Sequence, residues 1–261
     1  MAEDSFIKNT ANLFKTLGTD DFGRELKNTL HTQLPFDGSA IILFHPRYSP
    51  TVLQEELIEH DEEVFWQNYM RGAYLLDPFY RLCIQGQQGM FHLRDIAPEG
   101  FFSSSYYKRY FNPAGINDEI NYIFQAPEEV SGMVSITRSA AQNRFSKAER
   151  AKLQELSGFV DAAVLRHLDV RGAPFDNVLP NYRPILLQER LDNFSRDILT
   201  SREYEIAHLM LRGFSSKASA NFLDISPATE RTHRKSIYKK MKVNSHAELL
   251  AQAFEFLLAE A

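Results

Sequence analysis

The chain has 261 residues, a net charge of −5, one cysteine and a hydrophobic fraction of 44%. This composition is typical of a globular protein with one large or two ordinary domains. The lone Cys83 excludes an intramolecular disulfide and a multi-cysteine metal cluster, and no run approaches the roughly 18 apolar residues of a membrane helix. We therefore expect no leader, no membrane partner and a cytoplasmic location.

The first two thirds of the chain alternate between helical and strand-like patterns. Helices are expected over residues 4–17, 22–34, 61–69, 77–85, 103–111 and 146–168, and strands over 39–44, 51–58, 120–124 and 133–137. The first two strands predict a hairpin, and Asp77 is expected to cap the helix that begins at Pro78. This order favours an α-β-α sandwich of the GAF or PAS kind over residues 1–170.

Residues 171–194 contain three prolines and a glycine and show no sustained hydrophobic period. This pattern is typical of a linker. The remaining residues, 195–261, are expected to form a separate all-α domain, which makes the fold class α+β.

The last domain carries clear helix start and stop residues. Thr200–Glu203 and Ser245–Glu248 have the pattern of helix capping boxes. Gly213 predicts a helix end with left-handed backbone, and Ser226 with Pro227 predicts a helix start. Four short helices are the result. Only Asp224 and Ile225 join the second to the third, and this spacing predicts a helix-turn-helix.

A basic patch coincides with this predicted helix-turn-helix. Residues 210–242 contain eight lysines and arginines against two acidic residues. On the helix that starts at Ser226, a rotation of 100° per residue places Arg231, Thr232 and Lys235 on one face. A small, polar and basic face of this kind can enter the major groove of DNA, whereas the simpler interpretation is a solvated helix face.

A long stretch of the tail resembles the helix-turn-helix of LuxR-type transcription regulators. The matching positions are Leu199–Glu203, Gly213, Lys217, Ala220, Leu223, Ile225–Ser226, Thr229, His233, Ile237–Tyr238, Lys240–Met241, Val243 and Glu248–Leu249. The resemblance implies double-stranded operator DNA as the partner. It places Arg231, Thr232 and Lys235 in the major groove and Lys217 and Lys240 at phosphates, and Ser226 and Thr229 complete the expected DNA-binding set.

Two positions depart from the LuxR pattern. Ser219 and Glu230 stand where the family usually has aliphatic residues. Glu230 is expected to pair with Arg234 one turn further on, at an exposed site where such a pair contributes about 0.3 kcal/mol.

The N-terminal domain resembles the autoinducer-binding domain of quorum-sensing LuxR proteins. The resemblance rests on Trp66, Tyr69, Tyr74, Asp77–Pro78, Gly115–Glu119 and Gly132–Ser135. It implies that the tryptophan and tyrosines bond a ligand's carbonyl groups and that Asp77 accepts from the ligand's amide. Ser135 and Thr137 lie two apart on a predicted strand, so they share a face and are expected to line the same cavity.

Other interpretations of these ligand candidates stay open. The aromatic residues are equally consistent with core packing, and Asp77 with a helix cap alone. Trp66 also stands closer to Asp77 than in the autoinducer receptors. A region that contains Asp77, Asp118 and Glu119 suits a cationic amine as well as an acyl-homoserine lactone.

These observations predict a transcription regulator, controlled by a small-molecule effector of unknown identity, that binds DNA as a homodimer through two half-sites. The helices from Ser146 and from Ser245 are the candidate dimer contacts. No phosphate-binding glycine loop, HExxH pair or Gly-x-Ser-x-Gly motif indicates an enzyme, and no cofactor or metal site is expected. The alternative is a LuxR-type regulator controlled by phosphorylation or by a protein partner, without a ligand.

Overall fold

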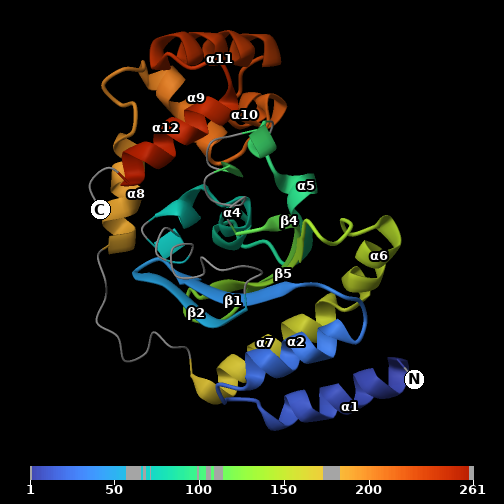
Figure 1. Cartoon of the computed structure of the whole chain (residues 1–261). Helices are drawn as coiled ribbons and strands as arrows, with labels where there is room; N and C mark the ends of the chain where they lie inside the picture. Colours follow the sequence, from blue (N-terminus) through green and yellow to red (C-terminus); the bar gives the residue numbers. More distant parts are fainter. Residues whose placement is uncertain are drawn as a thin grey trace.

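The computed structural model describes residues 2–56, 66, 69–70, 72–98, 100–103, 107–108, 114–172 and 183–258 (Figure 1). Its N-terminal part contains α1 (Ala2–Lys15), α2 (Phe22–His31), β1 (Gly38–His45), β2 (Tyr48–Glu56), the 3-10 helix η1 (Ala73–Leu76), α4 (Pro78–Ile84), β3 (Gly89–His92), α5 (Leu93–Ile96), the 3-10 helix η2 (Phe101–Ser103), β4 (Ile116–Gln125), β5 (Ser131–Ser139), α6 (Lys147–Glu155) and α7 (Ser157–Arg171). Its C-terminal part contains α8 (Arg183–Asn193), α9 (Ser201–Leu211), α10 (Ser216–Phe222), α11 (Pro227–Met241) and α12 (His246–Leu258).

The N-terminal part is built on an antiparallel sheet with the strand order β2-β1-β5-β4-β3. The predicted hairpin of β1 and β2 is confirmed. Strand β1 is buried along its whole length, which explains its uninterrupted apolar run. The sequence reading missed β3, because four residues at a sheet edge are too few to show a strand period.

Helices cover both faces of this sheet, so the predicted sandwich and the α+β class are confirmed. Helices α1, α2 and α7 lie below it in Figure 1, and α6 lies at its side, in contact with β3. On this face Leu26 and Val160 pack with Ile120 and Val134 of the sheet. The other face carries η1, α4 and α5. One apolar core lies between the sheet and the helices below it. A second apolar core lies between the sheet and the helices above it and extends to the C-terminal helices.

Two helix boundaries differ from the predictions. The helix expected over 146–168 is two helices, which meet at Leu156; the weak helix formers Ser157 and Gly158 follow directly. Residues 183–193, expected to be part of the linker, form α8. Pro184 does not prevent this helix, because it lies in the first turn, where a proline is tolerated. The helices expected over 61–69 and 103–111 lie mostly outside the described residues.

The C-terminal helices pack directly on the N-terminal part. One apolar core runs from Leu76 and Phe79 to Leu187, Met210 and Leu257. Helix α12 contacts both η1 and α9, and Figure 1 shows α11 on the side of the C-terminal helices turned away from the sheet. None of the described helices is long and apolar enough to cross a bilayer.

Candidate functional site

Helix α11 presents the predicted DNA-binding face to solvent. Ser226 caps it by accepting a hydrogen bond from the Thr229 amide at 3.0 Å, and Pro227 occupies the first turn, as expected. The other end stops at Lys242, which adopts a left-handed φ of 56°. Ile237 and Met241 are buried in the domain core, whereas the opposite face is exposed. The exposed residues of that face are Ser226, Thr229, Arg231, Thr232 and Lys235.

Two side chains of this face donate hydrogen bonds to backbone carbonyls of α11 itself. The hydroxyl of Thr232 donates to the carbonyl of Ala228 at 3.0 Å, and Arg231 Nε donates to the carbonyl of Pro227 at 3.2 Å. The bond from Arg231 lays its side chain along the start of α11. Residues near the N-terminus of the recognition helix make base contacts in helix-turn-helix proteins, so the start of α11 is a suitable place for a guanidinium.

The two lysines expected at phosphates differ in their surroundings. Lys217 is exposed on α10. Lys240 is part of an internal network, because its ammonium group bonds Glu203 Oε2 at 2.7 Å. Glu203 is buried and also closes the predicted capping box with Thr200, which is confirmed. The sequence gives no indication of the Lys240–Glu203 pair, since the two residues are 37 positions apart.

Glu230 is not exposed, contrary to the sequence interpretation. Its pair with Arg234 is present, with 2.6 Å between Arg234 Nε and Oε1, but the carboxylate is fully buried. Ser216 Oγ donates to the same carboxylate, and Arg234 Nη2 donates to the carbonyl of Phe214 at 3.0 Å. Arg234 also reaches toward Ser219 Oγ at 3.5 Å, so the two departures from the family pattern are joined in one buried polar network.

The second predicted capping box is only half formed. The amide of Glu248 donates to Ser245 Oγ at 3.1 Å, but the Glu248 carboxylate accepts from the amide of Asn244 instead of that of Ser245. Helix α12 therefore starts where expected with a different second cap.

In the N-terminal part, Asp77 caps α4 and also bonds a predicted ligand residue. Oδ1 accepts from the Phe79 amide at 2.8 Å, and Oδ2 accepts from the Tyr69 hydroxyl at 2.9 Å. Burial raises the pKa of Asp77 to about 6, against the opposing effect of these two bonds. Each oxygen keeps a lone pair with which it can accept a further donor.

The three predicted aromatic residues lie together. The ring of Trp66 meets that of Tyr69 edge-on with 5.7 Å between centroids, and Tyr69 is 6.0 Å from Tyr74. Tyr74 is buried and packs against Tyr80 and Phe44. Trp66 is half-buried, so it is the most accessible of the three.

Ser135 and Thr137 share a sheet face with two residues that the sequence reading did not select as a pair. Register places Glu119 opposite Thr137, and Asn121 opposite Ser135. Glu119 Oε1 accepts from Ser135 Oγ and from Asn121 Nδ2, both at 2.8 Å. The alternation of β4 could have indicated that Glu119 and Asn121 face together, but not that the sheet buries both.

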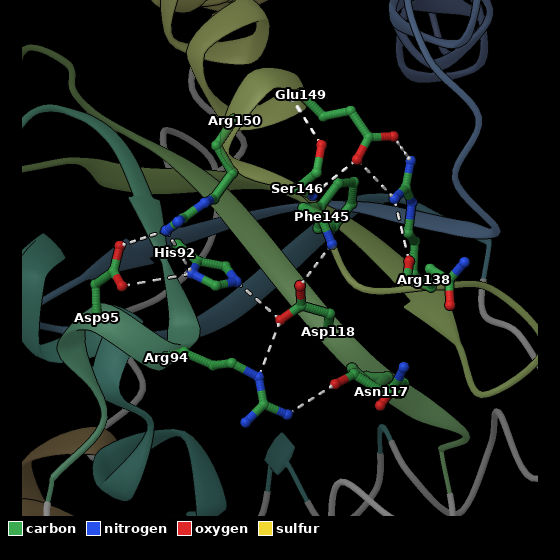
Figure 2. Close-up of polar contacts among 12 residues, drawn as sticks. His92, Arg94, Asp95, Asn117, Asp118, Arg138, Phe145, Ser146, Glu149 and Arg150 are labelled. Atoms are coloured by element: carbon green, nitrogen blue, oxygen red, sulfur yellow. Dashed lines mark hydrogen bonds and ion pairs between the residues drawn. The ribbon is translucent and has the colours of Figure 1, made fainter.

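Asp118 points to the other face and belongs to a different cluster (Figure 2). Its Oδ1 lies 2.8 Å from His92 Nε2, and its Oδ2 accepts from the Phe145 amide at 2.9 Å. Burial opposes the charge of Asp118, but the bonds from His92 and Phe145 and the nearby Arg94 lower its pKa overall. This carboxylate thus links β4 to β3 and α6, and the sequence grouping of Asp118 with Asp77 and Glu119 was wrong.

A separate cleft opens between β1, α4 and α8, with a volume of about 490 Å³. Its lining includes Phe44, Tyr80 and Gln188 and none of the predicted ligand residues. The predicted ligand residues and this cleft therefore lie at different places on the upper face of the sheet.

Comparison with known proteins decides the nature of the C-terminal part. Residues 197–253 match the family described as "Bacterial regulatory proteins, luxR family". The C-terminal domain is a LuxR-family DNA-binding domain. A response regulator, TmoT of Ectopseudomonas mendocina, is 45% identical over 56 residues, which cover 22% of this chain and 26% of that protein. The similarity to TmoT thus has the extent of the LuxR-family domain alone.

Two further proteins are similar outside the LuxR-family domain. A protein named as an HTH-type transcriptional regulator, from the exeN 3′ region of Aeromonas salmonicida, is 25% identical over 179 residues, 66% of this chain and 90% of its own length. The solved VqsR LBD domain of Pseudomonas aeruginosa is 28% identical with a TM-score of 0.55, and the match covers 62% of this chain and 96% of that domain. The N-terminal sandwich therefore has a counterpart in the solved VqsR LBD domain.

Proposed function

We propose that this LuxR-family regulator binds operator DNA through α11 and that a small molecule held by the N-terminal domain controls this binding. Residues 1–170 form the effector domain, and residues 195–261 form the DNA-binding domain. The similarity to VqsR supports the effector role, because the matched part of that protein is its LBD, or ligand-binding, domain. Similarity to a response regulator is limited to the DNA-binding domain, which gives no support to control by phosphorylation.

Helix α4 is the observation that carries ligand control, because it touches both domains. Asp77, a predicted ligand residue, caps its start. Four residues further, about 6 Å along the helix, Arg81 donates to the carbonyl of Arg212 at the end of α9 and, at 3.3 Å, to that of Ile96. A movement of the Asp77 cap is therefore transmitted within one helical turn to the DNA-binding domain.

Gly213 shows how closely the two domains fit at this point. Its φ is +75°, and a Cβ placed on it would lie 1.7 Å from Arg81 Nη1. Glycine at this position thus allows the left-handed backbone that ends α9 and leaves space for the Arg81 guanidinium. The contact is specific enough to hold one relative arrangement of the domains.

The DNA-bound form that we propose is a homodimer, since one recognition helix reads only a few base pairs. In the single chain, the apolar side of α12 is already covered by α8, α9 and η1. We therefore assign the dimer contact to the helices that begin at Ser146. Light scattering of the full chain, with and without operator duplex, measures this state.

The test of ligand control uses the full chain and an operator duplex selected from a random library. Small molecules released from the purified protein are identified by mass spectrometry and titrated back while fluorescence anisotropy reports DNA binding. The molecule should change the Kd for operator several-fold. Arg81→Ala should bind the molecule as well as the parent does but lose most of the DNA response, whereas Arg24→Ala, an exposed control on α2, should keep it.

Two outcomes would contradict the proposal. If the Arg81→Ala variant responds fully, α4 is not the link between the domains. If no molecule is released and a small phosphodonor instead leaves a covalent phosphate, the effector role itself is wrong.

A further inference from the structure

A compact polar cluster faces η1 and α4 from the middle of the sheet. Glu119 and Asn121 on β4 lie opposite Thr137 and Ser135 on β5, and the four residues are between 0% and 7% exposed. Their neighbours on this face are apolar, among them Ile42, Ile123 and Met133. Polar groups in such surroundings need partners, because burial removes their bonds to water.

The hydrogen bonds of this cluster leave acceptors unused. Glu119 Oε1 accepts from two donors of the cluster, Asn121 Nδ2 and Ser135 Oγ. Within the described part of the chain, Asn121 Oδ1 and Thr137 Oγ1 have no hydrogen-bond partner although both are buried. Native structures pair nearly all such groups, so two orphaned oxygens in one buried cluster indicate that a donor from outside the chain belongs here.

The charged groups around Glu119 also indicate that this cluster takes a donor from outside the chain. No described lysine, arginine or histidine forms an ion pair with Glu119. The titratable groups that act on it electrostatically are Asp77, Tyr107 and, from the opposite face of the sheet, Asp118. Burial and the adjacent Asp77 raise the pKa of Glu119 to about 8, despite its bonds to Asn121 and Ser135. Glu119 is therefore mainly uncharged at neutral pH until a positive group approaches.

We propose that Glu119, together with Asn121 Oδ1 and Thr137 Oγ1, anchors a protonated primary amine of the effector. An ammonium group has three donors and no acceptor, which complements one carboxylate and two orphaned oxygens. A neutral ligand that offers only carbonyl oxygens could accept from the protonated Glu119 or the Thr137 hydroxyl, but it would leave the buried Asn121 Oδ1 without a donor. The inference rests on the proposed effector role and specifies the chemistry of the molecule.

The proposal couples binding to proton release. The amine enters with its charge, and the carboxylic acid of Glu119 loses its proton to solvent as the ion pair forms. With a pKa of about 8, the ionised fraction of Glu119 rises close to tenfold from pH 6 to pH 7. Affinity for the amine should rise by a similar factor, with a smaller addition from Asp77, which titrates near pH 6.

The experiment uses isothermal titration calorimetry on the full chain with 2-phenylethylamine and hexylamine as probes. Their alcohols, 2-phenylethanol and 1-hexanol, have nearly the same shape without the charge, and N-octanoyl homoserine lactone represents neutral autoinducers. Titrations in phosphate and in Tris, whose ionisation enthalpies differ, count the protons released. The variants are Glu119→Gln, which keeps the acceptor for Ser135 and Asn121, and Glu155→Gln, an exposed carboxylate on α6, as the matched control.

At least one amine should bind tenfold or more tightly than its alcohol and release close to one proton at pH 7. Glu119→Gln should remove both the preference and the proton release, while Glu155→Gln retains them. The proposal is overturned if no amine binds, or if amine binding survives Glu119→Gln unchanged. Equal binding of the lactone to parent and Glu119→Gln would overturn the amine subsite but preserve the effector role, and failure of every released or added molecule would overturn both.

Discussion

The buried position of Glu230 leads to a large predicted loss of stability on truncation. Glu230→Ala removes the carboxylate that Arg234 Nε contacts at 2.6 Å and leaves a guanidinium whose side chain is only 12% exposed without its counterion. It also removes the acceptor of Ser216 Oγ. Breaking a buried pair by deleting one partner costs about 3–5 kcal/mol, because the remaining charge stays desolvated.

This value is roughly ten times what an exposed pair on a helix contributes, about 0.3–0.5 kcal/mol. The pair of Arg202 and Glu205 on α9 is such an exposed pair, with side chains 44% and 50% exposed, and Glu205→Ala is therefore the matched control. The double variant Glu230→Leu/Arg234→Leu removes both charges at once. It should lose much less than the sum of its single variants, since no unpaired charge is left behind.

Urea titrations measure these free energies, with circular dichroism for the helices and the fluorescence of Trp66, the only tryptophan in the chain, for the N-terminal domain. Two probes are needed because two domains can unfold in separate steps. The reasoning is refuted if Glu230→Ala loses no more than Glu205→Ala, or if the double variant loses the full sum of its singles.

Two further predictions concern the DNA-binding domain. Arg231→Ala should cost about 1–3 kcal/mol on operator and much less on a scrambled duplex, whereas Lys217→Ala should weaken both alike and lower the salt slope by about one; anisotropy at several salt concentrations separates these results, and the reversed pattern would contradict the docking of α11. For Glu203, burial opposes the charge, but bonds from Lys240, Ser236 and Thr200 lower the pKa to about 2 from 4.5. The folded state then gains up to about 3 kcal/mol above pH 4.5 and loses it as pH falls toward 2. Glu203→Gln should flatten the stability curve over that range in acid titrations, and an unchanged curve would show that the network is not coupled to folding.

The sequence predicted most of the structure where local chemistry determines it. Caps and turns at Asp77, Thr200, Gly213 and Ser226 were placed correctly, because each depends on residues within three or four positions. The helix-turn-helix followed from the same short-range pattern. These are the features for which one residue type satisfies one backbone geometry.

Features that depend on distant partners were not predictable. The burial of Glu230 needs Ser216 at the start of α10 and the carbonyl of Phe214 in the segment before it. The separation of Asp118 from Glu119 follows from strand alternation combined with which face each helix covers. Helix α8 was not predicted within the expected linker 171–194, because Pro184 was counted among its prolines although a proline is tolerated in the first turn of a helix.

The continuous apolar core between the two domains has a consequence for how such a protein can change over generations. Leu187 and Leu257 pack against the segment around Gly72, so the C-terminal domain would expose an apolar surface if the N-terminal domain were exchanged for an unrelated one. Recombination between the two domains would therefore yield insoluble chimeras unless the exchanged fragment also carried the residues of this apolar interface. Substitutions at this interface are expected to arise in compensating pairs, and the two domains are expected to be inherited together.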